Sequence, residues 1–238
     1  MVSSPADVVT VFPRSIVLIM QVSATIKSLV IVLLFISSPT AYTKETSILV
    51  YGDSISAAYG MEVEQGWVHL LAQHLGSLSP DYNVINASVS GETTGGGLVR
   101  LPKALDIHQP DLVILELGGN DGLRGYPIDK ISANLDSMVS LIKETNTPVL
   151  LIGMVLPPNY GRRYTTAFEN VFSEVAARNN LPFVPFLLNG VATQESLLQR
   201  DGIHPKPEAQ PMLLNDIWQA LAVLLDENPD HDFTSPAE

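Results

Sequence analysis

Short apolar runs alternate with longer amphipathic stretches along most of this chain. The apolar runs are rich in Val, Ile, Leu and Phe, which is typical of strands that are buried on both faces of a parallel sheet. The sequence therefore predicts five strands, with the sequences SILVYG (47–52), YNVINA (82–87), DLVILELG (111–118), PVLLIGM (148–154) and PFVPF (182–186).

The stretches between these runs have the apolar spacing of amphipathic helices, which are predicted over residues 66–76, 93–108, 128–145, 164–180 and 208–226. Strands that alternate with helices are joined by right-handed crossovers, which place helices on both faces of the sheet. We therefore expect a three-layer α/β/α, doubly wound fold with a parallel five-stranded sheet, formed by one domain over residues 44–227. The acidic, polar stretch 228–238 is expected to be a solvated tail.

The first 43 residues differ from the rest of the chain. A continuous apolar run, SLVIVLLFI (28–36), follows Lys27 and precedes the polar stretch SSPTAYT, a pattern typical of a secretory signal peptide. A second apolar run over residues 15–20 would make the region before the signal core overlong, so we expect a true start at Met20. The expected location of the protein is the periplasm or the exterior of the cell.

An uncleaved membrane anchor over residues 16–37 is the alternative interpretation of this segment. It would bury Lys27 near the middle of the bilayer, at a cost of roughly 2.5–3.5 kcal/mol. The apolar run 28–36 alone is too short to cross a bilayer, which favours removal of the segment. After that removal we expect no stable membrane span.

Composition narrows the possible partners. The chain has 238 residues and a formal net charge of −12, and residues 1–43 contain only Arg14, Lys27 and Asp7 as charged residues. The remaining chain is therefore strongly acidic and should repel nucleic acids and anionic membrane surfaces. The complete absence of cysteine excludes disulfides, thiolate metal sites and a cysteine nucleophile.

Polar or glycine-rich stretches follow four of the five predicted strands. They are Gly52-Asp53-Ser54, NASVSGETT (86–94), GGNDG (118–122) and LPPNYGRRY (156–164), and DGIHP (201–205) precedes the last predicted helix. In open α/β sheets, ligands bind outside the carboxyl ends of the strands. These stretches are therefore predicted to meet at one site.

The residues in these stretches suit acyl transfer, which needs a hydroxyl, a base, a carboxylate that orients the base, and donors for an oxyanion. Ser54 supplies the hydroxyl, and Asp201 could hold one ring nitrogen of His204 while the other acts on that hydroxyl. Two simpler interpretations remain open at this point. Ser54 could be a helix N-cap, and DGIHP could be a surface turn.

Gly91 and Asn120 are candidate oxyanion donors. A glycine N–H can approach a ligand closely, and the Asn120 side-chain amide follows two glycines at a strand end. Ordinary turn formation is the alternative explanation for both residues. Apolar residues after the third and fourth strands would wall a groove for an acyl chain, and the candidates are Leu123, Tyr126, Leu156 and Pro157.

No metal or cofactor is expected. The histidines lack zincin spacing, the acidic residues do not form an EF-hand pattern, and the glycines of residues 95–97 lack the Lys-Ser/Thr of a phosphate loop. The expected partner is a small-molecule substrate, and we expect the protein to be a monomer.

The motifs YGDSISAAYG, NASVSGETT, GGND and DGIHP together resemble the SGNH, or GDSL, hydrolase family. The resemblance implies a flavodoxin-like sheet with strand order 2-1-3-4-5, and hydrolysis of acyl esters and thioesters without metal or cofactor. It also implies these roles: Ser54 as nucleophile, Asp201 and His204 as its catalytic partners, and the Ser54 N–H, Gly91 and Asn120 as the oxyanion hole.

Over residues 46–225 the likeness is to a bacterial branch of the family with thioesterase, lysophospholipase and arylesterase activity and a periplasmic location. One position departs from that branch, because Val155 stands where an arginine is expected. The acyl-chain or head-group preference is therefore not carried over.

Two other functions compete with an acyl esterase. One is a carbohydrate deacetylase of the same superfamily, although the only tryptophans that could stack on sugars, Trp67 and Trp218, are predicted on helices. The other is a non-catalytic module for a lipid or glycan, because a fold alone does not establish activity.

Overall fold

The computed structural model describes residues 45–234, so the predicted signal or anchor segment lies outside the described residues. Five strands form one sheet in the order β2-β1-β3-β4-β5, and every neighbouring pair is parallel. The parallel direction was predicted from the sequence, and this strand order is the one that the family resemblance implies. The strands are β1 (Thr46–Gly52), β2 (Tyr82–Asn86), β3 (Leu112–Glu116), β4 (Val149–Ile152) and β5 (Phe183–Val184).

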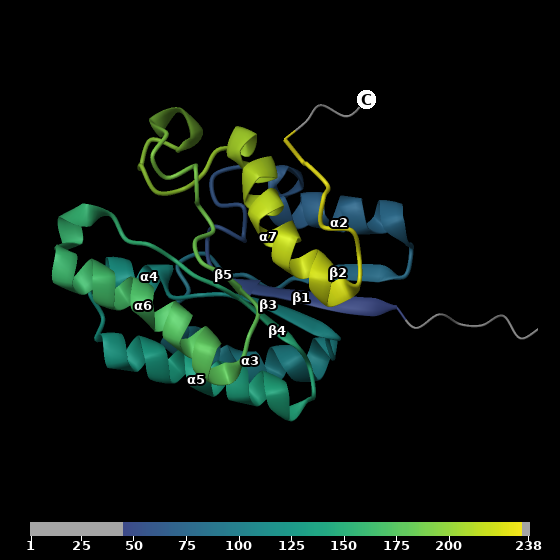
Figure 1. The fold of residues 1–238 in the computed structure, drawn as a ribbon, viewed down its shortest axis with the longest axis horizontal. Helices are drawn as coiled ribbons and strands as arrows, with labels where there is room; N and C mark the ends of the chain where they lie inside the picture. Colours follow the sequence, from purple (N-terminus) through teal and green to yellow (C-terminus); the bar gives the residue numbers. More distant parts are fainter. Residues whose placement is uncertain (1–44, 235–238) are drawn as a thin grey trace, which may run out of the picture. The chain divides into compact units, whose positions relative to one another are not determined.

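Helices cover both faces of this sheet, as predicted. Figure 1 shows α2 and α7 on one face and α3, α5 and α6 on the other. Within these layers α2 packs on α7, and α5 packs on both α3 and α6. The helices are α2 (Trp67–Leu78), α3 (Thr94–His108), α4 (Gly119–Leu123), α5 (Ile128–Glu144), α6 (Arg162–Asn179) and α7 (Gln210–Leu225).

The largest differences from the predicted elements lie at the sheet edges and after β3. The edge strand β2 is mostly half-buried, so the prediction that all five strands are buried on both faces is wrong for this strand. The other edge strand, β5, has only two residues because Pro182 and Pro185 flank it and cannot donate ladder hydrogen bonds. The short helix α4 was not predicted, since its five residues are too few for a helical period.

The core lies between the sheet and its two helical layers. The central strands β1, β3 and β4 contribute side chains that are almost completely buried, including Ile48, Ile114 and Leu150. Trp67 on α2 and Trp218 on α7 are also buried. These rigid central strands end at one edge of the sheet, where the polar stretches of the sequence follow.

The segment after α7 packs against the domain and is not wholly solvated as expected. The Phe233 ring lies against the core, and the Phe233 N–H donates to Asn215 Oδ1 of α7 at 2.8 Å. The indole N–H of Trp218 donates to the Asn228 carbonyl at 3.1 Å. The Phe233 ring and these two hydrogen bonds thus hold the segment after α7 to the fold.

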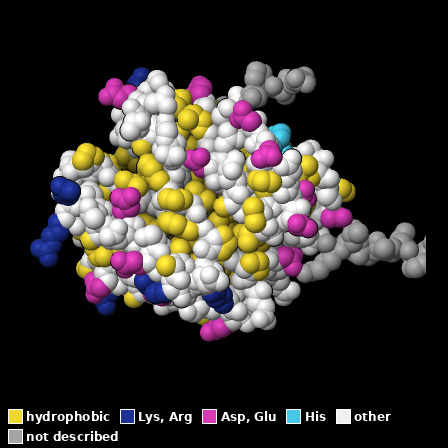
Figure 2. All heavy atoms as spheres, in the orientation of Figure 1, with side chains coloured by type: hydrophobic (Ala, Val, Ile, Leu, Met, Phe, Trp, Pro, Cys, Tyr) yellow, Lys and Arg dark blue, Asp and Glu magenta, His cyan; other side chains and the backbone are white. Residues whose placement is uncertain are grey.

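One face of the described domain carries a concentration of apolar side chains. Figure 2 shows this apolar band over β5 and α7, with acidic side chains distributed around it. Within residues 45–234, no helix combines the length and hydrophobicity needed to cross a bilayer.

Candidate active site

The turn after β1 presents Ser54 at the carboxyl edge of the sheet. Residues 53–60 form consecutive turns and not a regular helix, with hydrogen bonds from the Ala57 N–H to the Asp53 carbonyl and from the Tyr59 N–H to the Ser54 carbonyl. Asp53 Oδ1 accepts the Ile55 N–H at 3.1 Å. The side chain that caps this turn is therefore Asp53, and the interpretation of Ser54 as a helix N-cap is wrong.

His204 lies in a loop that is closed by short antiparallel pairing. Leu198 and Pro205 form an isolated bridge, and the Gln199 N–H donates to the His204 carbonyl at 2.8 Å. Asp201 Oδ1 accepts the N–H groups of Ile203 and His204 at 2.9 and 3.0 Å. These bonds fix the loop in a conformation that directs the imidazole toward the turn after β1.

Ser54, His204 and Asp201 form a hydrogen-bonded chain. His204 Nε2 lies 2.9 Å from Ser54 Oγ, and His204 Nδ1 lies 2.7 Å from Asp201 Oδ2. Burial alone would raise the pKa of Asp201, but hydrogen bonds from the Ile203 and His204 N–H groups and from the His204 ring lower it below its ordinary value. Asp201 is thus a carboxylate bonded to the imidazole. DGIHP is an exposed turn, but its His204 bonds both Asp201 and Ser54.

Gly91 and Asn120 line the same cavity as Ser54. Gly91 has a φ of +79°, a backbone conformation that favours glycine, and its carbonyl accepts from Arg124 Nη2 at 3.1 Å. Asn120, on α4, donates one amide hydrogen to Asp53 Oδ2 at 3.0 Å. Its second amide hydrogen has no acceptor within residues 45–234. Within residues 45–234, the N–H groups of Ser54 and Gly91 donate to no protein acceptor.

Two buried carboxyl groups lie beneath the Ser54 turn. Glu116, at the end of β3, is fully buried, and its Oε2 accepts from Ser56 Oγ at 2.6 Å and from the Asp53 N–H at 3.2 Å. Burial, reinforced by the neighbouring Asp53, raises the pKa of Glu116 well above its ordinary value. Burial likewise raises the pKa of Asp53 to about 6, against hydrogen bonds from Ile55 and Asn120 that lower it.

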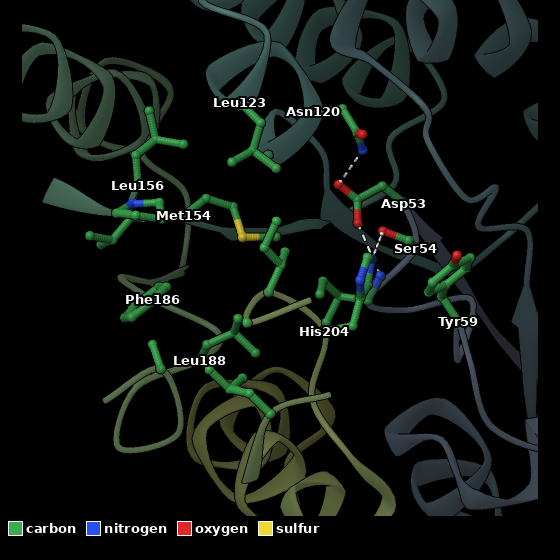
Figure 3. Close-up of a pocket in the computed structure, with 18 of the residues that line it drawn as sticks. Asp53, Ser54, Tyr59, Asn120, Leu123, Met154, Leu156, Phe186, Leu188 and His204 are labelled. Atoms are coloured by element: carbon green, nitrogen blue, oxygen red, sulfur yellow. Dashed lines mark hydrogen bonds between the residues drawn. The ribbon is translucent and has the colours of Figure 1, made fainter. Parts of the chain in front are cut away.

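A cavity of about 560 Å³ opens at the Ser54 hydroxyl. Figure 3 shows Ser54, His204 and Asn120 toward one end of this cavity. Gly91 also lines the cavity, and apolar side chains form most of the remaining wall. Figure 3 shows these apolar groups on the far side of the cavity from Tyr59. They include Leu123, Met154, Leu156, Phe186 and Leu188.

A family profile described as the GDSL-like lipase/acylhydrolase family matches residues 50–210, which contain every element of this site. The chain belongs to this family. Its sequence is 50% identical over 179 residues to "Esterase TesA" of Pseudomonas aeruginosa, covering 75% of this chain and 89% of that protein. It is also 45% identical over 196 residues to the "Arylesterase" of Vibrio mimicus, covering 82% of this chain and 98% of the relative.

A solved structure extends the similarity to the fold. The psychrotrophic esterase EstA from Pseudoalteromonas sp., inhibited by monoethylphosphonate, has 38% sequence identity and a TM-score of 0.73. The match covers 76% of this chain and all of the EstA chain. The flavodoxin-like α/β architecture implied by the sequence motifs is therefore that of a GDSL-like hydrolase.

The predicted acyl-wall residues of this GDSL-like protein are only partly correct. Leu123, Leu156 and Pro157 line the cavity, but Tyr126 does not. Tyr126 lies beyond the end of α4, with an exposed side chain, and its carbonyl accepts from the Tyr164 hydroxyl at 2.8 Å. Helix α4 ends at Leu123, and the chain then turns away from the cavity before Tyr126. This turn could not be predicted from the position of Tyr126 in the sequence.

Sequence reasoning missed the part of the wall that follows β5. Phe186, Leu188 and Leu198 line the cavity, although only the loops after the third and fourth strands were expected to do so. The apolar stretch FLL directly after Pro185 was a usable signal, because polar residues are normal in a surface loop. Val155, the position that departs from the related branch, also lines the cavity.

The described residues offer no evident metal site. No group of three or more His, Asp or Glu side chains within residues 45–234 is arranged to hold a metal ion.

Proposed function

We propose that this protein is a serine hydrolase that cleaves carboxylic esters and thioesters through an acyl-enzyme on Ser54. The observation that carries the proposal is the chain of hydrogen bonds from Asp201 through His204 to Ser54 Oγ at the end of an apolar cavity. Membership of the GDSL-like family and the similarity to proteins named esterase and arylesterase support it.

In the acylation step, Ser54 Oγ attacks the substrate carbonyl carbon while His204 Nε2 takes the hydroxyl proton. Asp201 stabilises the imidazolium that forms and keeps its Nδ1–H directed at the carboxylate. The N–H groups of Ser54 and Gly91 and the free amide hydrogen of Asn120 would stabilise the oxyanion. The C–O or C–S bond then breaks, and His204 returns its proton to the leaving group.

Deacylation repeats these steps with water. His204 removes a proton from a water molecule, which attacks the acyl-enzyme carbonyl, and the same donors stabilise the second oxyanion. The collapse of that intermediate releases the carboxylic acid and restores the Ser54 hydroxyl. No step of the proposed reaction requires a metal or a cofactor.

The shape of the cavity supports an acyl chain as the substrate's buried part. A volume of about 560 Å³ lies within the range of small-molecule sites, and its wall of Leu, Met and Phe side chains suits a hydrocarbon. Long-chain acyl-CoA and lysophospholipid are therefore included with simple esters as substrates to be tested. A carbohydrate deacetylase is less well supported, since Trp67 and Trp218 are buried in the core and cannot stack on a sugar.

A panel of p-nitrophenyl esters from acetyl to palmitoyl, with palmitoyl-CoA and lysophosphatidylcholine, tests this function. We expect turnover of medium or long acyl esters and a loss of about a thousandfold or more in Ser54→Ala. Ser137→Ala is the matched control, because Ser137 lies on α5 and donates to a carbonyl of its own helix.

Three results of this panel would change the proposal. Absence of turnover by the wild type would contradict an enzyme and favour a binding module. Turnover of acetyl esters alone would favour a deacetylase. Full activity in Ser54→Ala would remove Ser54 from its role.

We further propose that the protein acts as a monomer in the periplasm or outside the cell. The signal-like pattern of residues 1–43 supports this location. Cell fractionation with N-terminal sequencing of the purified protein would test it, and a chain that retains residues 16–37 in the membrane fraction would favour an anchor. Light scattering of the purified protein would test the monomer.

A further inference from the structure

Tyr59 lies beside the proposed catalytic imidazole on the opposite side of the cavity from the apolar wall. Its ring centroid is 4.4 Å from that of His204, with 39° between the ring planes. Figure 3 shows Tyr59 on one side of Ser54 and His204, with Leu156, Phe186 and Leu188 on the other. Tyr59 also lines the cavity, and its side chain is 50% exposed.

Hydrogen bonds to its backbone N–H and carbonyl hold Tyr59 in place. Its N–H donates to the Ser54 carbonyl at 3.1 Å, and its carbonyl accepts from Gln199 Nε2 at 2.7 Å. Gln199 belongs to the loop that carries Asp201 and His204, so Tyr59 is linked to both the serine turn and the histidine loop. The preceding residue, Ala58, has a φ of +57°, a left-handed conformation that is uncommon for a residue other than glycine.

The geometry of a tetrahedral intermediate determines what can occupy the space at Tyr59. In the proposed reaction, Ser54 Oγ is one substituent of the reacting carbon, the oxyanion would face Gly91 and Asn120, and the acyl chain would extend toward the apolar wall. The remaining substituent is the leaving group, whose oxygen must lie near His204 Nε2 to receive its proton. The ring of Tyr59 is the large aromatic surface next to that imidazole.

We propose that Tyr59 forms a leaving-group platform that favours esters with an aromatic alcohol portion. This inference rests on the proposed function and assigns the leaving-group side of the same site. The exposed face of Tyr59 packs against the aryl ring while the aryl C–O bond breaks and the His204 proton passes to the phenolate oxygen. The proposed contact is made by the ring of Tyr59 and not by its hydroxyl.

The first test compares phenyl butyrate with ethyl butyrate, which share one acyl group. We expect Tyr59→Leu to lower kcat/KM for the phenyl ester by about threefold to tenfold, the range of an aromatic contact, and to change the ethyl ester by less than about twofold. Tyr59→Phe should retain the wild-type preference. Tyr82→Leu, a distant tyrosine at the start of β2, is the matched control for the loss of a tyrosine ring.

The second test separates a platform from a support for His204. Deacylation of the butyryl-enzyme proceeds after the alcohol has left, so Tyr59→Leu should leave the deacylation rate constant within about twofold of the wild-type value. Equal losses with both esters and in deacylation would overturn the platform and assign Tyr59 to positioning His204. An unchanged phenyl-to-ethyl ratio in Tyr59→Leu would also overturn it, while the proposed esterase function would stand. A wild type that cleaves neither ester would overturn both.

Discussion

Asp53 and Glu116 place two buried carboxyl groups directly beneath the serine proposed as the nucleophile. Both pKa values are raised by burial, and the Oε1 atom of Glu116 has no hydrogen-bond partner within residues 45–234. Two adjacent buried carboxylates would repel each other, so the neutral form of Glu116 is favoured. The neutral acid can still accept hydrogen bonds from Ser56 and the Asp53 N–H, and it thereby fixes the start of the Ser54 turn.

The raised pKa of Asp53 predicts a pH-dependent stability. Its folded pKa of about 6 exceeds the ordinary value of 3.8, so the native state binds the proton more tightly than the unfolded chain does. The contribution of Asp53 to stability should therefore fall as the pH rises from about 4 to 6, by about 3 kcal/mol at most. Urea unfolding at several pH values should show Asp53→Asn gaining stability relative to wild type across this window.

Asp201→Asn provides a control of opposite sign. The folded pKa of Asp201 lies below 3.8, so its carboxylate stabilises the native state above that pH and the stabilisation is lost as the pH falls further. The stability difference between wild type and Asp201→Asn should therefore shrink only in strong acid. A stability difference between wild type and Asp53→Asn that is independent of pH would contradict the raised pKa of Asp53.

The predicted site residues that the structure brings together share a local signature. Asp201 and His204 belong to one short loop, and Ser54, Gly91 and Asn120 each follow a strand end at the same sheet edge. The missed or misplaced residues depend on packing between distant segments. Glu116 is buried by the β1 turn, Tyr59 meets His204 from a distant loop, and the end of α4 places Tyr126 outside the cavity.

Helix α4 shows how a short element positions a functional group. It follows Gly118, which has a φ of +126°, and begins at Gly119, so that Asn120 faces Asp53. Its buried Asp121 accepts the Thr94 N–H and hydroxyl at 2.8 and 2.6 Å, which ties α4 to the start of α3. A sequence pattern cannot predict such a helix, because five residues complete little more than one turn.

Close packing of α4 predicts that Gly122 does not tolerate a methyl group. A Cβ at Gly122 would lie 2.6 Å from Phe168 Cε2 and 2.8 Å from Leu156 Cδ2. Because Phe168 is fully buried and cannot move aside freely, Gly122→Ala should lower the free energy of unfolding by about 1–3 kcal/mol. Urea unfolding of the purified variant would measure this loss.

Gly76→Ala is the matched control for this change. Gly76 lies within α2, and no atom would lie within 4 Å of an added Cβ. The higher helix propensity of alanine should therefore stabilise the protein by about 0.5–1 kcal/mol. Equal effects of the two substitutions would contradict the packing described for α4.

At the scale of the whole domain, a cluster of aromatic and imidazole rings packs the C-terminal segment against α2 and α7. The His74 ring of α2 lies 4.4 Å from His231 and 4.5 Å from Trp218 of α7, and Phe233 completes the cluster. The expected solvated tail is therefore partly an element of the fold. The packing of this segment could not be predicted from its composition, because His231 and Phe233 are its only ring-bearing residues apart from the prolines and the rest is mostly polar.

This ring cluster predicts a loss of stability in mild acid. Burial and the neighbouring His231 lower the pKa of His74 below 6.5, although Glu227 opposes them. Since the unfolded chain takes up this proton first, the contribution of the cluster should be lost as the pH falls below about 6.5. Thermal melts of His74→Gln should show a weaker dependence on pH than those of the wild type.

His69→Gln is the control on the same helix, because His69 lies outside the ring cluster. It should retain the wild-type dependence of the melting temperature on pH. The same dependence in His74→Gln would show that His74 does not contribute to the loss in acid.

The central claim is that Ser54 is the nucleophile of an esterase. The most direct measurement is mass spectrometry of the protein after reaction with a p-nitrophenyl ethylphosphonate, whose phosphorus atom traps an activated serine. The account predicts one ethylphosphonyl group on Ser54, parallel loss of esterase activity, and no adduct in Ser54→Ala. An adduct on Ser90, which also lines the cavity, or complete inhibition with Ser54 unmodified would contradict it.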